Sequence, residues 1–257
     1  DVDKKYKFEN KYFTDPEILK KKIIDKTIIP HQVEFQPGAQ GKKICWLSCP
    51  YCYGESAINN EERPSTERLV EILNEIADGG VNKVTFAGWA TDPLNSKSID
   101  DLLETAIKRK MIFGFNTKPL KVSDKFVSLL KDNEIHKDSW ISLSIDSGSN
   151  NIFNKVHGMN TSAPLYDRVL SNVKRIKEAN NPIRKFDVSA AYLLNKFNSS
   201  KDEISKFLSD FKEAGCNLVR FSFAQPPRGL VNKGEIETVP LTEEKSKIMN
   251  NLKEWIK

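Results

Sequence analysis

The sequence Cys45-Trp46-Leu47-Ser48-Cys49-Pro50-Tyr51-Cys52 places three thiols within eight residues. The fourth cysteine of the chain, Cys216, lies far away in sequence. Thiolates are the usual ligands of iron–sulfur clusters. A cubane cluster has four irons, so three cysteines ligate three of them and leave the fourth open to another ligand. The stretch therefore predicts a cluster that takes part in chemistry as well as carrying electrons.

Two other kinds of site are compatible with cysteines alone. A structural zinc site has four ligands, usually in two close pairs, but the nearest histidines, His31 and His136, lie well outside the cysteine stretch. A disulfide would leave one of the three cysteines unpaired, and Pro50 indicates a loop and not a buried core segment. The open cluster is the favoured interpretation, and zinc remains the alternative.

Cysteines separated by three and then two residues, with the aromatic Tyr51 before the last, resemble the radical SAM superfamily. The resemblance implies a [4Fe-4S] cluster held by Cys45, Cys49 and Cys52, with S-adenosylmethionine bound to its open iron. It implies that an electron from the cluster cleaves S-adenosylmethionine to a 5′-deoxyadenosyl radical. That radical would abstract a hydrogen atom from a peptide or small-molecule substrate. The electron would come from a donor such as flavodoxin or ferredoxin.

Length and composition narrow the class of protein. The 257 residues suffice for one large domain, and no apolar run approaches the ~20 residues of a membrane span. The net charge of +5 is mild, so it does not indicate nucleic-acid binding. We expect no signal peptide, because residues 1–26 are charged throughout, and four cysteines in a non-secreted chain would favour metal binding or catalysis over disulfides. A reduced cluster needs a reducing compartment, so we expect a cytoplasmic protein.

Strand-like and helical patterns alternate along the chain, which implies an α/β fold with a parallel sheet. Ser65 and Ser200 are candidate N-caps of two of the helices, and Glu203 would complete a capping box with Ser200. Six strand–helix units suit a partial (β/α)6 TIM-like barrel, the architecture for which the radical SAM superfamily is known. Strands are predicted at 31–36, 81–89, 111–116, 140–146, 186–194 and 218–223.

Two parts of the chain are expected. Residues 1–30 are predicted to be an N-terminal extension packed on the surface, with a short helix at 16–24. Residues 31–257 are predicted to be the barrel domain. In parallel barrels the reactive groups collect at the carboxyl ends of the strands. Those ends, together with Tyr51 of the cysteine stretch, give the candidate cofactor-binding residues Tyr51, Gly88, Trp89, Asn116, Lys118, Ser144, Asp146, Asn195 and Gln225; no catalytic residue is assigned.

The resemblance implies roles for several of these residues. The superfamily usually ends its second strand with a double-glycine, acidic, proline turn that meets the methionyl amino group. Here Trp89 replaces the second glycine, and Asp92-Pro93 stands in for the acidic residue and proline.

The remaining implied roles concern the rest of S-adenosylmethionine. Ser144 or Asp146 would contact the ribose, Lys118 the methionyl carboxylate, and Tyr51 the adenine, while residues 151–158 would form the loop after the fourth strand. Each of these side chains could instead serve only in packing or in a turn.

A second function, from a different class, stays open at this point. The lysine-rich N-terminal arm could serve a zinc- or cluster-binding nucleic-acid module without radical chemistry. Cys216 follows Gly215 and precedes the sixth predicted strand, at the amino end of the barrel. A buried core cysteine is therefore favoured there over a hydrogen-atom donor.

Overall fold

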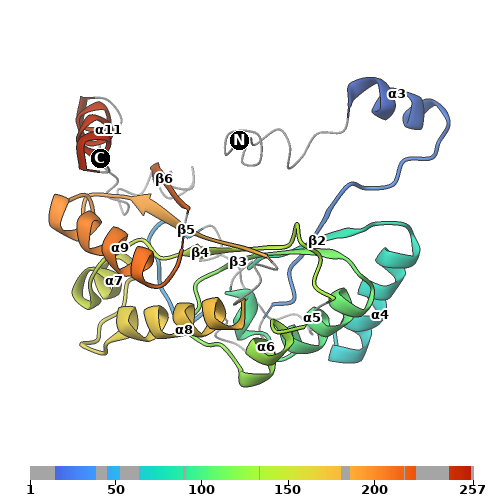
Figure 1. Ribbon diagram of the computed structural model, residues 1–257, viewed down its shortest axis with the longest axis horizontal. Helices are drawn as coiled ribbons and strands as arrows, with labels where there is room; N and C mark the ends of the chain where they lie inside the picture. The colour runs from blue at the N-terminus through green and yellow to red at the C-terminus, as the bar shows by residue number, and fades with distance from the viewer. Residues whose placement is uncertain are drawn as a thin grey trace.

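Six parallel strands form a single sheet whose spatial order is the same as their order in the chain (Figure 1). The structure is a computed structural model that describes residues 15–38, 45–52, 64–88, 91–132, 134–180, 186–216, 218–223 and 243–255. All six predicted strands are confirmed, several of them shorter than expected. Their bounds are β1 Val33–Phe35, β2 Lys83–Phe86, β3 Ile112–Thr117, β4 Trp140–Ser144, β5 Asp187–Leu194 and β6 Val219–Phe223.

The strands β1 and β6 lie at opposite edges of the sheet, which is therefore not closed. This arrangement is a partial TIM-like barrel, as predicted. The helices that connect the strands lie on one side of the sheet (Figure 1). They are α4 (Thr66–Asp78), α5 (Ile99–Lys108), α6 (Asp124–Leu129), α7 (Asn150–Val156), α8 (Leu165–Ala179) and α9 (Lys201–Glu213).

The main core lies between the sheet and these helices. Phe115 of β3 stacks against Phe86 of β2 at 4.9 Å between ring centroids and meets the ring of Phe126 from α6 edge-on at 5.3 Å. At the other end of the sheet, Phe221 of β6 lies 5.5 Å from Tyr192 of β5 and 6.3 Å from Phe207 of α9. Aromatic side chains of this size supply much of the apolar area that stabilises the fold.

We call the opposite side of the sheet the inner face, because it corresponds to the interior of a closed barrel. Side chains alternate between the two sides of a strand. Asn116, Ser142 and Ser144 therefore point to the inner face, because Phe115, Ile141 and Leu143 are buried in the core. A Cβ on Gly114 would lie 2.3 Å from the indole of Trp140. Only glycine lets that indole lie across β3 on the inner face.

The ends of the helices follow from local sequence, with one exception. Ser65 and Ser200 are N-caps, and their hydroxyls accept hydrogen bonds from Arg68 N and Glu203 N. The second half of the predicted capping box is wrong. The Glu203 carboxylate instead accepts hydrogen bonds from Gly148 N and from Ser149 Oγ.

This departure arises because the loop after β4 packs directly on α9. A Cβ on Gly148 would lie 2.2 Å from Glu203 O. The prediction of a loop at 151–158 also needs correction, because α7 occupies residues 150–156. Ser149 is its N-cap and accepts a hydrogen bond from Ile152 N.

The described part of the N-terminal extension contains the predicted helix, α3 (Pro16–Ile24). Asp15 caps it by accepting a hydrogen bond from Glu17 N at 2.9 Å. None of its residues is buried, and it stands apart from the sheet in Figure 1. The expected packing on the domain surface is therefore not observed for this helix.

Two further elements complete the described chain, the short 3-10 helix η1 (Pro93–Asn95) and the C-terminal helix α11 (Glu243–Trp255). Among the described helices, none combines the length and the apolar character needed to cross a membrane.

Candidate functional site

A cavity of about 600 Å³ opens at the carboxyl ends of the strands. This volume is in the range of small-molecule and cofactor sites. Segments that follow all six strands, or the strand ends themselves, contribute to its lining. Of the residues predicted from sequence, those that line it are Cys45, Cys49, Tyr51, Cys52, Gly88, Asn116, Lys118, Ser144 and Asp146.

Three predicted residues are not among this lining. Trp89 and Gln225 lie outside the described residues. Asn195 is described, but its side chain is used within the turn between β5 and α9, where Oδ1 accepts a hydrogen bond from Phe197 N at 2.9 Å. Asparagine commonly stabilises turns in this way. Asn195 therefore shapes a turn and does not reach the cavity.

The cysteine stretch contributes all three of its thiols to the cavity. Cys49 is buried, whereas Cys45 and Cys52 are partly exposed. A hydrogen bond of 3.0 Å from Cys52 N to Cys49 O folds the end of the stretch into a turn. Burial raises the pKa of the Cys49 thiol to about 12 and also raises that of Cys45. A metal centre that binds these cysteines must therefore displace their protons.

The number of cysteines in the cavity fits a cubane cluster. Cys45, Cys49 and Cys52 all belong to its lining. A cubane cluster has four irons, so three cysteine ligands leave one iron open to another ligand.

The cysteine stretch rests on the turn that ends α7. Ser48 N donates a hydrogen bond of 3.0 Å to His157 O. The next residue, Gly158, has a φ of +63°, and a Cβ there would lie 2.2 Å from Ser48 O. Glycine is therefore needed at this position both for its backbone conformation and for the close approach.

The His157 side chain is a part of the site that sequence reasoning missed. It is fully buried, with its ring 4.2 Å from that of Phe153. Because a carbonyl only accepts, Nδ1 donates to Phe153 O at 2.8 Å, and Nε2 then lies 3.5 Å from Asp146 Oδ2. Burial, reinforced by the positive charge of Lys118, lowers the pKa of His157 to about 4. The imidazole is therefore neutral at physiological pH.

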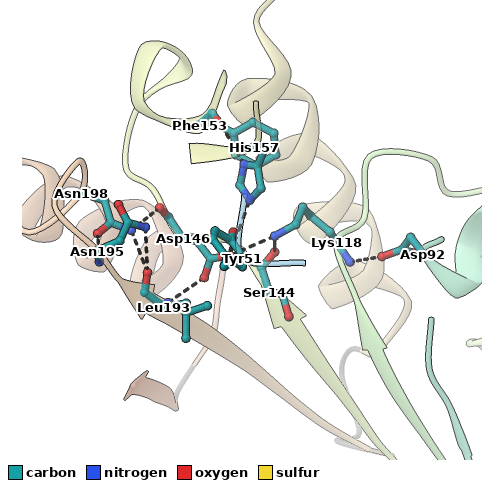
Figure 2. Close-up of polar contacts among 10 residues, drawn as sticks. All are labelled: Tyr51, Asp92, Lys118, Ser144, Asp146, Phe153, His157, Leu193, Asn195 and Asn198. Atoms are coloured by element: carbon teal, nitrogen blue, oxygen red, sulfur yellow. Dashed lines mark hydrogen bonds and ion pairs between the residues drawn. The ribbon is translucent and has the colours of Figure 1, made fainter. Parts of the chain in front are cut away.

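Asp146 is the centre of the polar network, as Figure 2 shows. Its Oδ2 accepts hydrogen bonds from Tyr51 OH at 3.0 Å and Lys118 Nζ at 3.1 Å, and its Oδ1 accepts one from Leu193 N at 2.7 Å. Burial alone would raise the pKa of Asp146, but the positive charge of Lys118 and the hydrogen bond from the Leu193 amide hold it well below its usual range. An ionised carboxylate thus joins the cysteine stretch to segments after β3 and within β5.

The backbone of Asp146 explains why β4 ends before it. Its φ of +62° lies in the left-handed region, which aspartate and asparagine tolerate better than most residues. The predicted strand at 140–146 included Asp146. The structure instead turns it out of the strand, which lets its carboxylate reach Tyr51 and Lys118 at once.

A second carboxylate, that of the partly buried Asp92, lies in the segment after β2. Its Oδ1 accepts hydrogen bonds from Thr117 Oγ1 at 2.6 Å and Leu94 N at 3.0 Å, and Oδ2 accepts one from Lys118 N. Burial raises its pKa to about 6 despite these bonds. Gly88 begins the same turn, and a Cβ there would lie 1.7 Å from Thr91 O.

The close contact at Gly88 predicts a selective effect of substitution. Gly88→Ala should destabilise the protein by at least about 2 kcal/mol, because the turn must open and move Asp92 from its partners. Gly79→Ala is the control, since its Cβ would have only ordinary contacts at 3.4 Å. We expect this control to change stability by no more than about 0.5 kcal/mol. Urea unfolding measures both, and equal losses would contradict the role of the turn.

The buried histidine predicts a pH effect on stability. His157 titrates near 6.5 in the unfolded chain and at about 4 in the folded protein, so its contribution is full above pH 6.5 and is lost as the pH falls toward 4. The raised pKa of Asp92 has the opposite effect, because it lowers the stability as the pH rises from about 4 to about 6. The contribution of His157 must therefore be isolated by comparison with a variant. The change in unfolding free energy between pH 7 and pH 5 should differ by about 2 kcal/mol between wild type and His157→Gln.

The matched control for this measurement is His136→Gln, at a partly exposed histidine outside the cavity. The control should keep the wild-type pH dependence. Parallel pH profiles of urea unfolding for wild type and His157→Gln would show that the buried imidazole is not linked to stability in this way.

Comparison with known proteins now identifies the family. The family model for the radical SAM superfamily matches residues 42–208. The protein belongs to the radical SAM superfamily. The matched region of this radical SAM protein contains the three cysteines, strands β2 to β5 and the helices between them. Members of the superfamily use a [4Fe-4S] cluster and S-adenosylmethionine, and the three-thiol cavity fits that pair of cofactors.

Curated relatives of this radical SAM protein have more than one activity. It is 34% identical over 109 residues to an S-adenosylmethionine-dependent nucleotide dehydratase of Lacinutrix mariniflava, covering 40% of this chain and 21% of that protein. A dehydratase of the same name from Flammeovirga pacifica is 31% identical over 133 residues, covering 50% of this chain and 43% of that protein. The sporulation killing factor maturation protein SkfB of Bacillus subtilis is 26% identical over 185 residues, covering 68% of this chain and 39% of that protein.

The chain spans less than half the length of these curated relatives. Among solved structures, Streptococcus suis SuiB bound to its precursor peptide SuiA superposes with a TM-score of 0.66 at 16% identity, covering 93% of this chain and 49% of that chain. Kitasatospora setae TsrM, with cobalamin and a [4Fe-4S] cluster bound, superposes with a TM-score of 0.55 at 12% identity, covering 75% of this chain and 34% of that chain. At these identities the structures confirm the fold alone.

Proposed function

We propose that the protein is a radical SAM enzyme that reductively cleaves S-adenosylmethionine and abstracts a hydrogen atom from a peptide or small-molecule substrate. The observation that carries the proposal is the meeting of three thiols with the Asp92, Lys118 and Ser144 side chains in one cavity. When bound, the cluster supplies the electron, and S-adenosylmethionine supplies the radical. The chain itself binds and orients these groups and keeps water away from them.

Cys45, Cys49 and Cys52 are the proposed cluster ligands. Lys118 is the proposed partner of the methionyl carboxylate. Its ammonium has three donors, of which Ser144 O and Asp146 Oδ2 take two. Asp92 and the backbone of the turn that begins at Gly88 are proposed to face the methionyl amino group, the place that the superfamily gives to an acidic turn.

The ribose is assigned to Ser144 and not to Asp146. Both Asp146 oxygens already accept hydrogen bonds from protein donors, whereas the Ser144 hydroxyl lines the cavity and can exchange hydrogen bonds with a diol. Tyr51 is proposed to lie beside the adenine. Its hydroxyl is held by Asp146, which would fix the orientation of the ring.

The relatives support both substrate classes named in the proposal. Two are named as nucleotide dehydratases, and one matures a sporulation killing factor. An electron donor such as flavodoxin or ferredoxin and a cytoplasmic location complete the proposal, because the cluster must be reduced before each cleavage. The alternative of a zinc- or cluster-binding nucleic-acid module without radical chemistry finds no support in the family match, which covers the cysteines themselves.

The test is cleavage of S-adenosylmethionine by the reconstituted protein. After anaerobic loading with iron and sulfide, the protein should show the broad visible absorbance of a thiolate-bound cluster. With dithionite and S-adenosylmethionine it should release 5′-deoxyadenosine, which chromatography quantifies. A cluster-loaded protein that releases none would refute the proposed activity.

A further inference from the structure

Arg220 of β6 lines the cavity at the side opposite Lys118. Its neighbour in sequence, Phe221, packs toward Tyr192 and Phe207 in the core. Because side chains alternate along a strand, Arg220 and Ser222 point to the inner face. Both belong to the lining of the cavity. The guanidinium is therefore directed away from the helices and toward the space where a substrate would lie.

Arg220 has no carboxylate partner in the part of the chain that the structure describes. Several other described arginines pair with acidic side chains, as Arg68 does with Glu75 at 2.9 Å and Arg175 does with Asp124. The second cation of the cavity, Lys118, is paired with Asp146 at 3.1 Å. Of the charged side chains described in the lining, Arg220 thus holds a positive charge that no protein anion balances.

The sheet register separates Arg220 from the proposed S-adenosylmethionine contacts. Ser144 of β4 pairs with Ala191 of β5, and Ala191 pairs with Arg220 of β6. Two strand spacings therefore divide Ser144 from Arg220, or about 10 Å. Lys118 follows β3, on the other side of β4. The small side chain of Ala191 leaves the space in front of β5 open between Ser144 and Arg220.

We propose that Arg220 binds an anionic group of the substrate, a phosphate or a carboxylate. The inference rests on the proposed function and deepens it by naming the chemical class of the substrate. A guanidinium presents parallel donors that match the oxygens of either group. Ser222, two residues further along the same face, supplies a hydroxyl beside it. The substrate is thereby anchored at the β6 side, and its remaining atoms extend toward Ser144.

The test measures the binding of defined anions to the full chain by calorimetry at fixed ionic strength. One arm uses the four ribonucleoside triphosphates separately. The other uses a short glutamate-containing peptide and the same peptide with glutamine. We expect one arm to bind wild type, and Arg220→Ala to weaken that binding roughly 10- to 100-fold, the range for hydrogen bonds to charged groups. Arg220→Lys should weaken the binding less than Arg220→Ala does, because lysine keeps the positive charge and loses only the parallel N–H donors of the guanidinium.

The matched control is Arg168→Ala, at an exposed arginine on α8 outside the cavity lining. It should bind the probes as wild type does. Selective loss of triphosphate binding identifies phosphate as the anion, and selective loss of glutamate-peptide binding identifies carboxylate. Equal affinity of Arg220→Ala and Arg168→Ala, or no binding of any probe to wild type, would overturn the proposal.

The two proposals fail separately. Substrate-free release of 5′-deoxyadenosine by wild type and by Arg168→Ala tests the proposed function without involving the anion site. If wild type releases none but Arg220→Ala still loses anion binding, the anion site stands and the radical chemistry does not.

Discussion

Replacement of Cys49 by alanine will leave a protein that folds but does not assemble its cluster. Cys49 is the most buried of the three cavity thiols, and a cubane cluster with two remaining protein ligands loses the geometry that leaves a single iron open. After anaerobic reconstitution we expect iron and sulfide contents to fall to background. The visible absorbance of the cluster and the release of 5′-deoxyadenosine will be lost with them.

Cys216→Ala is the matched control for this experiment. Cys216 is buried in the core, away from the cavity lining. Its replacement should cost a modest amount of stability and leave the iron content unchanged. If Cys49→Ala binds as much iron as wild type does, the assignment of the three thiols as cluster ligands is wrong.

The second large effect concerns Asp146. Asp146→Asn keeps a side chain that tolerates the φ of +62° but removes the charge that balances Lys118. Because Lys118 is only 11% exposed, the variant leaves an uncompensated buried ammonium, and breaking a buried pair in this way typically costs about 3–5 kcal/mol. Urea unfolding of the protein without cofactors measures that loss directly.

The same variant should also loosen the cysteine stretch, because Tyr51 loses its ionised acceptor. Reconstituted Asp146→Asn is therefore expected to bind less iron than wild type. Glu213→Gln provides the control, since its partner Lys174 is exposed and such surface pairs contribute little. Equal stability of the two variants would mean that Asp146 does not support the site as the structure implies.

The strands were predictable because each is a short apolar or alternating run bounded by helices with clear periodicity. Phe113 and Phe115, for example, show the spacing of a buried strand face and are both fully buried. The rule that reactive groups collect at the carboxyl ends of parallel strands also predicted the location of the site. Gly88, Lys118 and Ser144, taken from three separate strand ends, line one cavity.

The parts that sequence did not predict depend on contacts between distant segments. The short helix α7 has little apolar periodicity and is fixed by its cap at Ser149 and by packing on α8. The burial of His157 against Phe153 and Asp146 follows from that helix. Local pattern also misassigned Glu203, because its carboxylate finds better donors in the loop after β4 than in its own helix.

The attachment of that loop to α9 has a consequence beyond stability. Gly148 and Ser149 are tied to the first turn of α9 through Glu203, and they follow Asp146 by only two and three residues. The outward side of α9, at Ser205 and Lys206, is exposed to solvent. These hydrogen bonds anchor the backbone just after Asp146 to the first turn of α9. The position of the carboxylate that accepts the hydrogen bond from Tyr51 therefore depends on a helix whose other side faces solvent.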